Sequence, residues 1–218
     1  MKFFIATSVL CLLCAPVAAA DLYVPTTPDA MVTTSGYDWS GFYIGAAAGG
    51  QGVRIFAPGE GTLEGTALVV GAFVGANAQS GNLVFGAEAD GEYSGYEGTR
   101  ACGNPAWSCY GYLNWQGSVR GRVGFAIDTI LLYGTAGVAI ANVGGSTTSP
   151  ANVVFPDSQV RVGWTVGAGV EAAFADNWFG RVEYRYTDLG ARDMNFDVVY
   201  GGVEVRSHAV RAGVGYKF

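Results

Sequence analysis

The sequence predicts an all-β protein, an eight-stranded antiparallel up-and-down transmembrane β-barrel. Apolar residues alternate with polar or small ones along one segment after another, and a period of two is that of a strand. Hydrophobic residues make up 50% of the chain and charged residues only 14%, yet no segment after the first 20 residues is a long unbroken apolar stretch. Transmembrane helices are therefore not expected, and a closed barrel remains as the fold that pairs every backbone group inside a membrane.

The start of the chain has the pattern of a secretory signal peptide. Lys2 gives a positive start, 3–15 is apolar, and small residues precede the predicted cleavage between Ala20 and Asp21. An N-terminal membrane anchor is the less favoured alternative, because the apolar core is short for a bilayer. The predicted domains are the signal peptide at 1–20, a Pro- and Thr-rich periplasmic N-terminal linker at 21–37, and the barrel at 38–218.

Eight extended segments are expected in the barrel. They lie at about 39–50, 66–78, 83–96, 112–126, 131–143, 158–175, 178–189 and 203–218. Most are longer than the roughly 9–11 residues that a tilted strand needs to cross a bilayer. Short connections (79–82, 127–130, 176–177) alternate with long ones (around 51–65, 97–111, 144–157, 190–202), which is typical of membrane barrels with short periplasmic turns and long external loops. A soluble sandwich would also have many strands, but its turns need not alternate in this way.

The last strand shows the alternation most clearly. Its apolar face consists of Val210, Ala212, Val214, Tyr216 and Phe218. Arg211 and Lys217 lie on the other face, among glycines. A strand that ends its apolar stripe in aromatic residues is suited to face lipid near a membrane surface.

Charged residues gather on one face of several strands, opposite an apolar face. The predicted lumen ion-pair network consists of Glu88, Asp90, Glu92, Arg120, Arg122, Glu171, Arg181, Glu183, Arg185 and Arg211. Arg161 and Lys217 are expected to be further lumen cations. An eight-stranded barrel is filled by its own side chains, and buried charges must pair, so the lumen is expected to hold ion pairs rather than an open channel. A soluble barrel would turn its apolar face inward, but the Trp and Tyr residues near the strand ends favour membrane girdles.

Several motifs resemble those of one family. They are Trp39-Ser40-Gly41-Phe42-Tyr43-Ile44-Gly45, Val166-Gly167-Ala168-Gly169-Val170-Glu171, Arg181-Val182-Glu183-Tyr184-Arg185-Tyr186 and the terminal Arg211-x-Gly213-x-x-Tyr216-x-Phe218. Together they resemble the small outer-membrane β-barrel proteins of alphaproteobacteria, the group called the Omp25/Omp31 or RopB-like porin family. The resemblance implies a Gram-negative outer-membrane surface protein that contributes to envelope integrity. It also implies that Arg211, Gly213, Tyr216 and Phe218 form the signal read by the barrel-assembly machinery.

Cys102 and Cys109 are the two cysteines outside the signal peptide, and both lie in the second long connection. In an oxidising periplasm a disulfide is expected. Such a disulfide would stiffen the loop. The stiffened loop could serve as a binding tip or external epitope, but protection of the loop from proteolysis is the favoured interpretation. A metal site is not expected, because two cysteines without a nearby histidine are an incomplete ligand set.

No enzyme activity and no cofactor are expected. His208 is the only histidine, and its neighbour Ser207 points to the opposite face of the strand, so the two cannot pair. Nucleic acid is excluded as a partner by the net charge of −6. The expected partners are outer-membrane lipid and lipopolysaccharide, with the assembly machinery during biogenesis. The leading hypothesis is a structural barrel, and the alternatives are a small passive diffusion porin and binding of a ligand or host surface by the loops.

Overall fold

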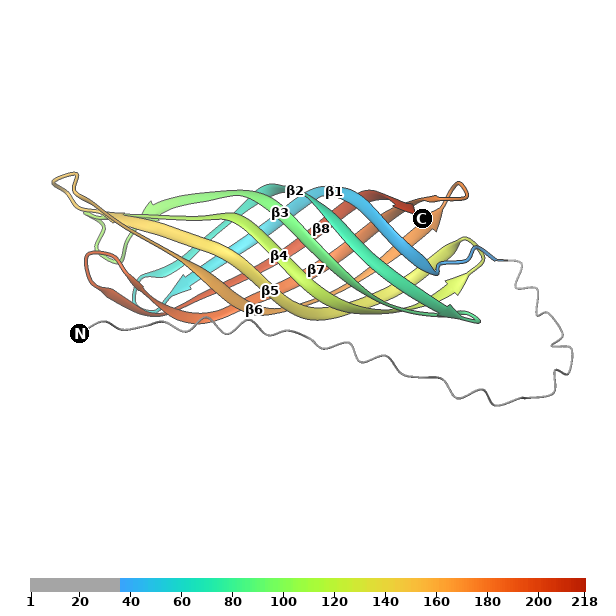
Figure 1. Cartoon of the computed structure of the whole chain (residues 1–218). Helices are drawn as coiled ribbons and strands as arrows, with labels where there is room; N and C mark the ends of the chain where they lie inside the picture. Colours follow the sequence, from blue (N-terminus) through green and yellow to red (C-terminus); the bar gives the residue numbers. More distant parts are fainter. Residues whose placement is uncertain (1–35) are drawn as a thin grey trace, which may run out of the picture. The chain divides into compact units, whose positions relative to one another are not determined.

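The computed structural model describes residues 36–218, which form a closed antiparallel barrel (Figure 1). The strands are β1 Gly41–Ala57, β2 Gly61–Ser80, β3 Leu83–Ala101, β4 Ser108–Ile127, β5 Ile130–Thr148, β6 Val154–Ala173, β7 Trp178–Asn195 and β8 Val199–Lys217. Each strand pairs with its neighbours in the chain, and β1 pairs with β8 to close the sheet. The predicted fold class is confirmed. The predicted signal peptide and most of the predicted linker lie outside the described residues. Within 36–218, no helix has the length and apolarity needed to cross a membrane.

The strands are longer than expected, at 17–20 residues each. β1, for example, continues past residue 50 because 51–57 pairs with 61–67 of β2. The prediction of long connections was therefore wrong in extent, since most of those residues extend the strands. The connections that remain are 58–60, 102–107, 149–153 and 196–198, here called the rim, and at the other end 81–82, 128–129 and 174–177, here called the turn end.

The outer face of the barrel is apolar. The most exposed large apolar side chains include Leu68 at 81%, Phe218 at 73% and Phe42 at 70%. Aromatic residues gather at two levels. One level, at the turn end, contains Phe42, Phe125, Phe174, Trp178 and Phe218, and the other contains Tyr93, Trp115, Trp164 and Tyr184. An apolar band between two aromatic girdles is the outer face of a membrane barrel.

The barrel interior contains two apolar clusters. One cluster, which includes Trp39, Tyr43, Phe73 and Phe179, fills the turn end. The other lies toward the rim and consists of Val53, Tyr96, Leu113, Ala139, Ala141, Val143, Leu189 and Val205. Charged side chains occupy the space between them, so the polar groups of this fold are inside and its largest apolar area is outside.

Candidate functional site

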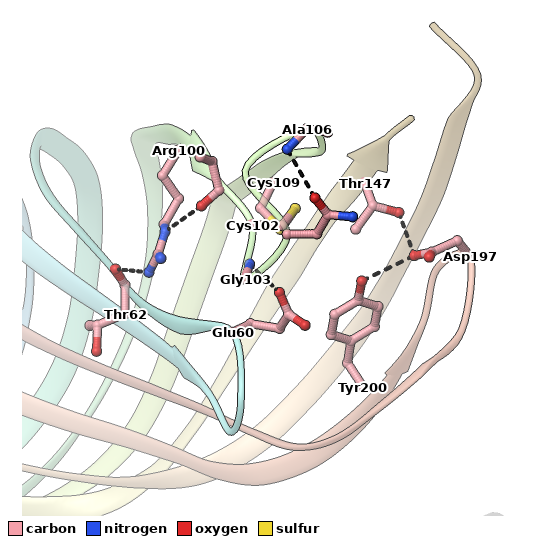
Figure 2. Close-up of a disulfide and its surroundings, with 12 residues drawn as sticks. Glu60, Thr62, Arg100, Cys102, Gly103, Ala106, Cys109, Thr147, Asp197 and Tyr200 are labelled. Atoms are coloured by element: carbon pink, nitrogen blue, oxygen red, sulfur yellow. Dashed lines mark hydrogen bonds between the residues drawn. A yellow bond between two sulfur atoms is a disulfide. The ribbon is translucent and has the colours of Figure 1, made fainter. Parts of the chain in front are cut away.

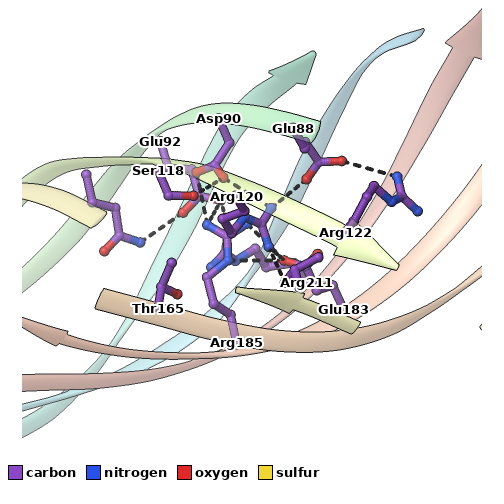
Figure 3. A network of polar contacts seen from close by, with 12 residues as sticks. Glu88, Asp90, Glu92, Ser118, Arg120, Arg122, Thr165, Glu183, Arg185 and Arg211 are labelled. Carbon is purple, nitrogen blue, oxygen red and sulfur yellow. Dashed lines mark hydrogen bonds and ion pairs between the residues drawn. The ribbon is translucent and has the colours of Figure 1, made fainter. Parts of the chain in front are cut away.

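Ten charged side chains form one connected layer across the barrel interior, and Figure 3 shows the part of it around Arg120. This ion-pair layer consists of Glu88, Asp90, Glu92, Arg120, Arg122, Glu171, Arg181, Glu183, Arg185 and Arg211. They lie at inward positions of β3, β4, β6, β7 and β8, because successive strand side chains point to opposite faces. None of these side chains is more than 6% exposed.

Arg120 lies at the centre of the layer and contacts three carboxylates. Its guanidinium is 2.5 Å from Glu88 Oε1, 3.2 Å from Asp90 Oδ1 and 3.0 Å from Glu183 Oε1. Glu88 is the residue opposite Arg120 in the β3–β4 register, whereas Glu183 reaches Arg120 from β7. Arg120 therefore joins neighbouring strands and also opposite walls of the barrel.

Toward the turn end, two arginines share two glutamates. Arg122 Nη2 lies 2.9 Å from Glu171 Oε2, and Arg181 Nη2 lies 2.7 Å from Glu88 Oε2 and also contacts Glu171. The Tyr43 hydroxyl accepts a hydrogen bond from Arg122 Nη1 (2.7 Å) and donates one to Glu88 Oε2 (2.9 Å). Arg181 Cζ also lies 3.9 Å from the centroid of the Phe73 ring, a cation–π contact. The charges thus pack directly on the turn-end cluster.

Toward the rim, the layer continues into neutral polar groups. Arg185 lies 2.9 Å from Asp90 Oδ2 and 2.9 Å from Glu183 Oε1. Arg211 binds the carboxylate of Glu92, which also accepts a hydrogen bond from Gln116 Nε2 at 2.9 Å. The carboxylate oxygens of Asp90 and Glu92 are therefore occupied by hydrogen-bond donors at this edge of the layer.

The layer contains five carboxylates and five guanidinium groups, so its formal charges balance. The two other predicted lumen cations lie outside this layer: Arg161 is buried in the barrel interior as predicted, whereas Lys217 lies at the barrel mouth, which corrects that part of the prediction. Lys217 is at the turn end, where its ammonium group donates to the Asp38 carbonyl and lies 4.6 Å from the centroid of the Tyr37 ring. Arg161 is buried nearer the rim, outside the layer. Lys217 does not reach the acids because it is the last residue of β8, at the barrel mouth. Arg161 does not reach them because it lies four residues nearer the rim than Thr165, on the same inward face of β6.

The sequence placed Ser118 on the inward face with Arg120 but did not single out Tyr133 and Thr135, two other neutral members of the site. Tyr133 donates to Glu183 Oε2 at 3.0 Å, Thr135 accepts from Arg120 Nη1 at 3.0 Å, and Ser118 donates to Asp90 Oδ1 at 2.5 Å. Strand alternation could have identified them, because each lies on the same inward face as a charged residue of its own strand or of the next strand. Hydrogen bonds from these groups satisfy lone pairs that the arginines leave open.

The terminal motif divides between the two faces of β8. Arg211 points inward, and Phe218 is exposed on the outer face at the turn end. Tyr216 packs against Trp178 and Phe218, with ring centroids 5.1 and 5.2 Å apart. At Gly213 a Cβ atom would lie 2.7 Å from the Ala46 carbonyl oxygen, so the β1–β8 seam needs a glycine there.

The rim contains the disulfide between Cys102 and Cys109, whose Cα atoms are 5.2 Å apart (Figure 2). The Glu60 carboxylate accepts a hydrogen bond from the Gly103 backbone N–H at 2.5 Å and so ties the disulfide loop to the 58–60 turn. Glu60 and the two sulfurs lie within 4.8 Å of one another, but sulfurs bonded to each other are not thiolate ligands for a metal.

A second rim contact joins β5 to the 196–198 turn (Figure 2). Thr147 Oγ1 and the Tyr200 hydroxyl both donate to Asp197 Oδ1, at 2.8 and 3.1 Å. Burial and the hydrogen bond to this carboxylate raise the pKa of Tyr200 to about 12, so the phenol remains a donor even at alkaline pH at which an unperturbed tyrosine begins to ionise.

His208 and Ser207 lie on opposite faces of β8. Ser207 is buried, whereas His208 is exposed on the outer face. The His208 ring is 2.6 Å from the Tyr184 hydroxyl through Nδ1 and packs against the Tyr186 ring. His208 therefore belongs to the aromatic girdle nearer the rim.

Comparison with known proteins agrees with this geometry. A family model described as "Outer membrane protein beta-barrel domain" matches residues 7–218. The chain is 38% identical to the 22 kDa outer membrane protein of Rhizobium leguminosarum bv. viciae, over 83% of this chain and 78% of the relative. It is 35% identical to the 25 kDa outer-membrane immunogenic protein of Brucella abortus, over 89% and 86%.

A solved structure shares the fold. The outer membrane protein OprG of Pseudomonas aeruginosa matches with a TM-score of 0.50 and 13% identity, covering 84% of this chain and 98% of that one. At that identity the likeness concerns the fold alone. The barrel, its apolar outer face and the extensive family match lead to one conclusion: the chain belongs to the outer-membrane-protein β-barrel family and is located in the outer membrane of a Gram-negative cell.

Proposed function

We propose that this chain is a structural barrel of the outer membrane whose interior the ion-pair layer closes to ions and solutes. The connected layer is the observation that carries the proposal, because it spans the interior between two packed apolar clusters. Two cavities border the layer, each of about 10 Å³. That is about the space of one water molecule, which is too little for a hydrated ion.

The proposed role is to support the integrity of the envelope. The apolar outer face and its two girdles fit the barrel tightly into lipid, and lipopolysaccharide is the proposed lipid contact in the outer leaflet. The turn end is proposed to face the periplasm and the rim the outside. A deletion strain is expected to become more sensitive to detergents, and the intact gene is expected to restore resistance. Unchanged sensitivity would contradict the role in envelope integrity.

Single-channel recording tests closure. Refolded wild-type protein in planar bilayers is expected to give no steady conductance. The double variant Glu92→Ala with Arg211→Ala removes the Glu92–Arg211 pair and the 3.9 Å contact between Glu92 and Arg185. Arg185 keeps Asp90 and Glu183, so no lone charge remains. A small conductance is expected from the space that the two substitutions open. Steady large conductance of the wild type would overturn the structural proposal in favour of the diffusion pore.

Removal of Phe218 is expected to impair assembly. In the proposed assembly signal (Arg211, Gly213, Tyr216 and Phe218), this residue supplies the exposed terminal aromatic. Its backbone N–H also bonds the Phe42 carbonyl across the β1–β8 seam at 2.9 Å. The amount of heat-modifiable barrel in outer-membrane fractions should fall several-fold. Phe174→Ala, which removes another exposed aromatic of the turn end (66% exposed), is the control and should assemble normally. Equal yields from both variants would contradict an assembly role for the terminal residue.

The proposal assigns no catalytic role. Its support is the separation of Ser207 and His208 onto opposite faces, together with the use of every layer carboxylate in ion pairs. A general base must reach the proton that it removes, and the layer acids are enclosed by arginines.

A further inference from the structure

Arg161 is a buried cation without an acidic partner among residues 36–218. Its side chain is fully buried, and Nη1 donates to the Val203 backbone carbonyl at 2.7 Å. None of the ion pairs formed by the described residues includes Arg161. Within this same part of the chain, Nε and Nη2 have no hydrogen-bond partner. Burying a charge in this way is costly unless an anion balances it.

The two open nitrogens form one edge of the guanidinium. Nε–H and Nη2–H point in parallel on the side away from Nη1, and this edge matches the two oxygens of a carboxylate. The arginines of the ion-pair layer use their N–H groups on Glu or Asp. Arg161 has the same chemistry available, and no carboxylate of residues 36–218 forms an ion pair with it; Asp157, on the same strand, acts on it only from a longer distance.

A cavity of about 70 Å³ lies at the rim, and Arg161 is not one of its lining residues. Its walls are mainly apolar and include Ile55, Leu63, Val143, Met194 and Val203. Glu60 and Arg100 also line it, and the Arg100 N–H groups already donate to the carbonyls of Thr62 and Ala101. Val203 is common to both features, because its carbonyl binds Arg161. The β5–β6 register places Arg161 close to the cavity. Arg161 pairs with Ala141, and the next residue of β5 on the same face is Val143, which lines the cavity and pairs with Gln159. Some of the residues labelled in Figure 2 also line this cavity: Glu60, Arg100, Cys109, Thr147 and Tyr200.

The size of the cavity limits what can enter. It has about half the volume of the ~150 Å³ apolar cavities that admit benzene, so it suits a chain of about three or four carbons. A mainly apolar space that shares Val203 with an unpaired guanidinium favours a ligand that is apolar at one end and anionic at the other.

We propose that the rim cavity and Arg161 together bind a short-chain monocarboxylate. The alkyl chain occupies the apolar cavity, and the carboxylate accepts hydrogen bonds from Nε and Nη2 of Arg161. Both nitrogens are covered in this structure, so a side chain at the cavity floor must move as the ligand enters. Met194 has the rotational freedom for this movement. The site lies on the rim side of the ion-pair layer and does not depend on whether that layer conducts.

Butyrate is the probe, titrated by calorimetry into full-length mature protein refolded in detergent. Saturable binding is expected for the wild type, and uncharged 1-butanol should bind at least tenfold more weakly. Arg161→Met keeps the length of the side chain without the charge and should lose at least tenfold in affinity. Arg54→Met, which changes an exposed arginine, should bind as the wild type does. Binding of butyrate by Arg161→Met at wild-type affinity, or no saturable binding by the wild type, would overturn the proposal.

A second pair of measurements separates ligand binding from a structural role. Without ligand, Arg161→Met should raise the urea midpoint of unfolding, because it removes a buried unpaired charge; butyrate should raise the midpoint of the wild type only. Gly111→Val should weaken butyrate binding while Arg161 is kept, since a Cβ there points at Leu63 Cδ2 (2.9 Å) and Ile55 Cδ1 (3.2 Å) in the cavity. A lower midpoint for Arg161→Met would mean that this arginine is structural and would refute the site.

Discussion

Replacing Arg120 with Ala is expected to lower the free energy of unfolding by about 3–5 kcal/mol, the cost of removing one partner from a buried ion pair. Arg120 contacts Glu88, Asp90 and Glu183, all of them almost completely buried. Without it, Glu183 keeps Arg185, and Glu88 keeps Arg122 and Arg181. The layer would then hold five acids and four bases, and one negative charge would have no counterpart.

Urea unfolding in lipid vesicles measures this change, with the heat-modifiable gel band as the readout. Arg54→Ala is the matched control, because it breaks the Arg54–Glu64 pair, whose side chains are 59% and 64% exposed. Exposed pairs contribute about 0–1 kcal/mol, so the control midpoint should barely move. If Arg120→Ala and Arg54→Ala gave equal midpoints, the layer would not hold the barrel together.

Replacing Gly49 with Ala is expected to prevent closure of the barrel. Gly49 pairs with Arg211 across the β1–β8 seam. A Cβ atom there would lie 2.0 Å from the Val210 carbonyl oxygen and 2.7 Å from Arg211 Cα. Overpacking usually costs about 1–3 kcal/mol, when side chains can adjust. Here the obstacle is backbone, so the expected cost is at the top of that range or above, and the folded band should be largely lost.

The next residue supplies the control. Gly50 lies on the same strand, and a Cβ atom there would meet nothing within 4 Å. Gly50→Ala should therefore fold to wild-type yield, with a small gain in stability because alanine loses less backbone entropy on folding. Equal yields from Gly49→Ala and Gly50→Ala would show that the seam can widen.

The faces of the strands were predictable from sequence alone. Alternation assigns Glu88, Arg120 and Arg181 to one side and Phe85, Val119 and Val182 to the other, and it requires only that each segment be a strand. The proximity of the acids of β3 to the arginines of β4 also followed, because consecutive strands are neighbours in an up-and-down barrel, but the register that places Glu88 opposite Arg120 did not.

Contacts across the interior were not predictable. Arg181 reaches Glu88, which lies 93 residues away in the chain, and Arg211 pairs with Glu92 rather than with its register partner Glu183. Such contacts depend on the diameter and stagger of the closed barrel, which alternation does not determine. The strand ends were missed for a related reason. Glycine-rich segments such as 49–52 suggest a strand end, yet the ladder continues there because the partner strand supplies its hydrogen bonds.

The shared ion pairs of the layer also restrict which substitutions this sequence can accumulate. Each of its five carboxylates lies within 4.0 Å of arginines from two different strands. A change at any of these carboxylates therefore disturbs at least two arginines, and tolerated variation should arise in compensated sets rather than singly. The rim turns are held by the disulfide and a few hydrogen bonds rather than by shared buried charges, so we expect sequence variation to concentrate there and the ion-pair layer to change least.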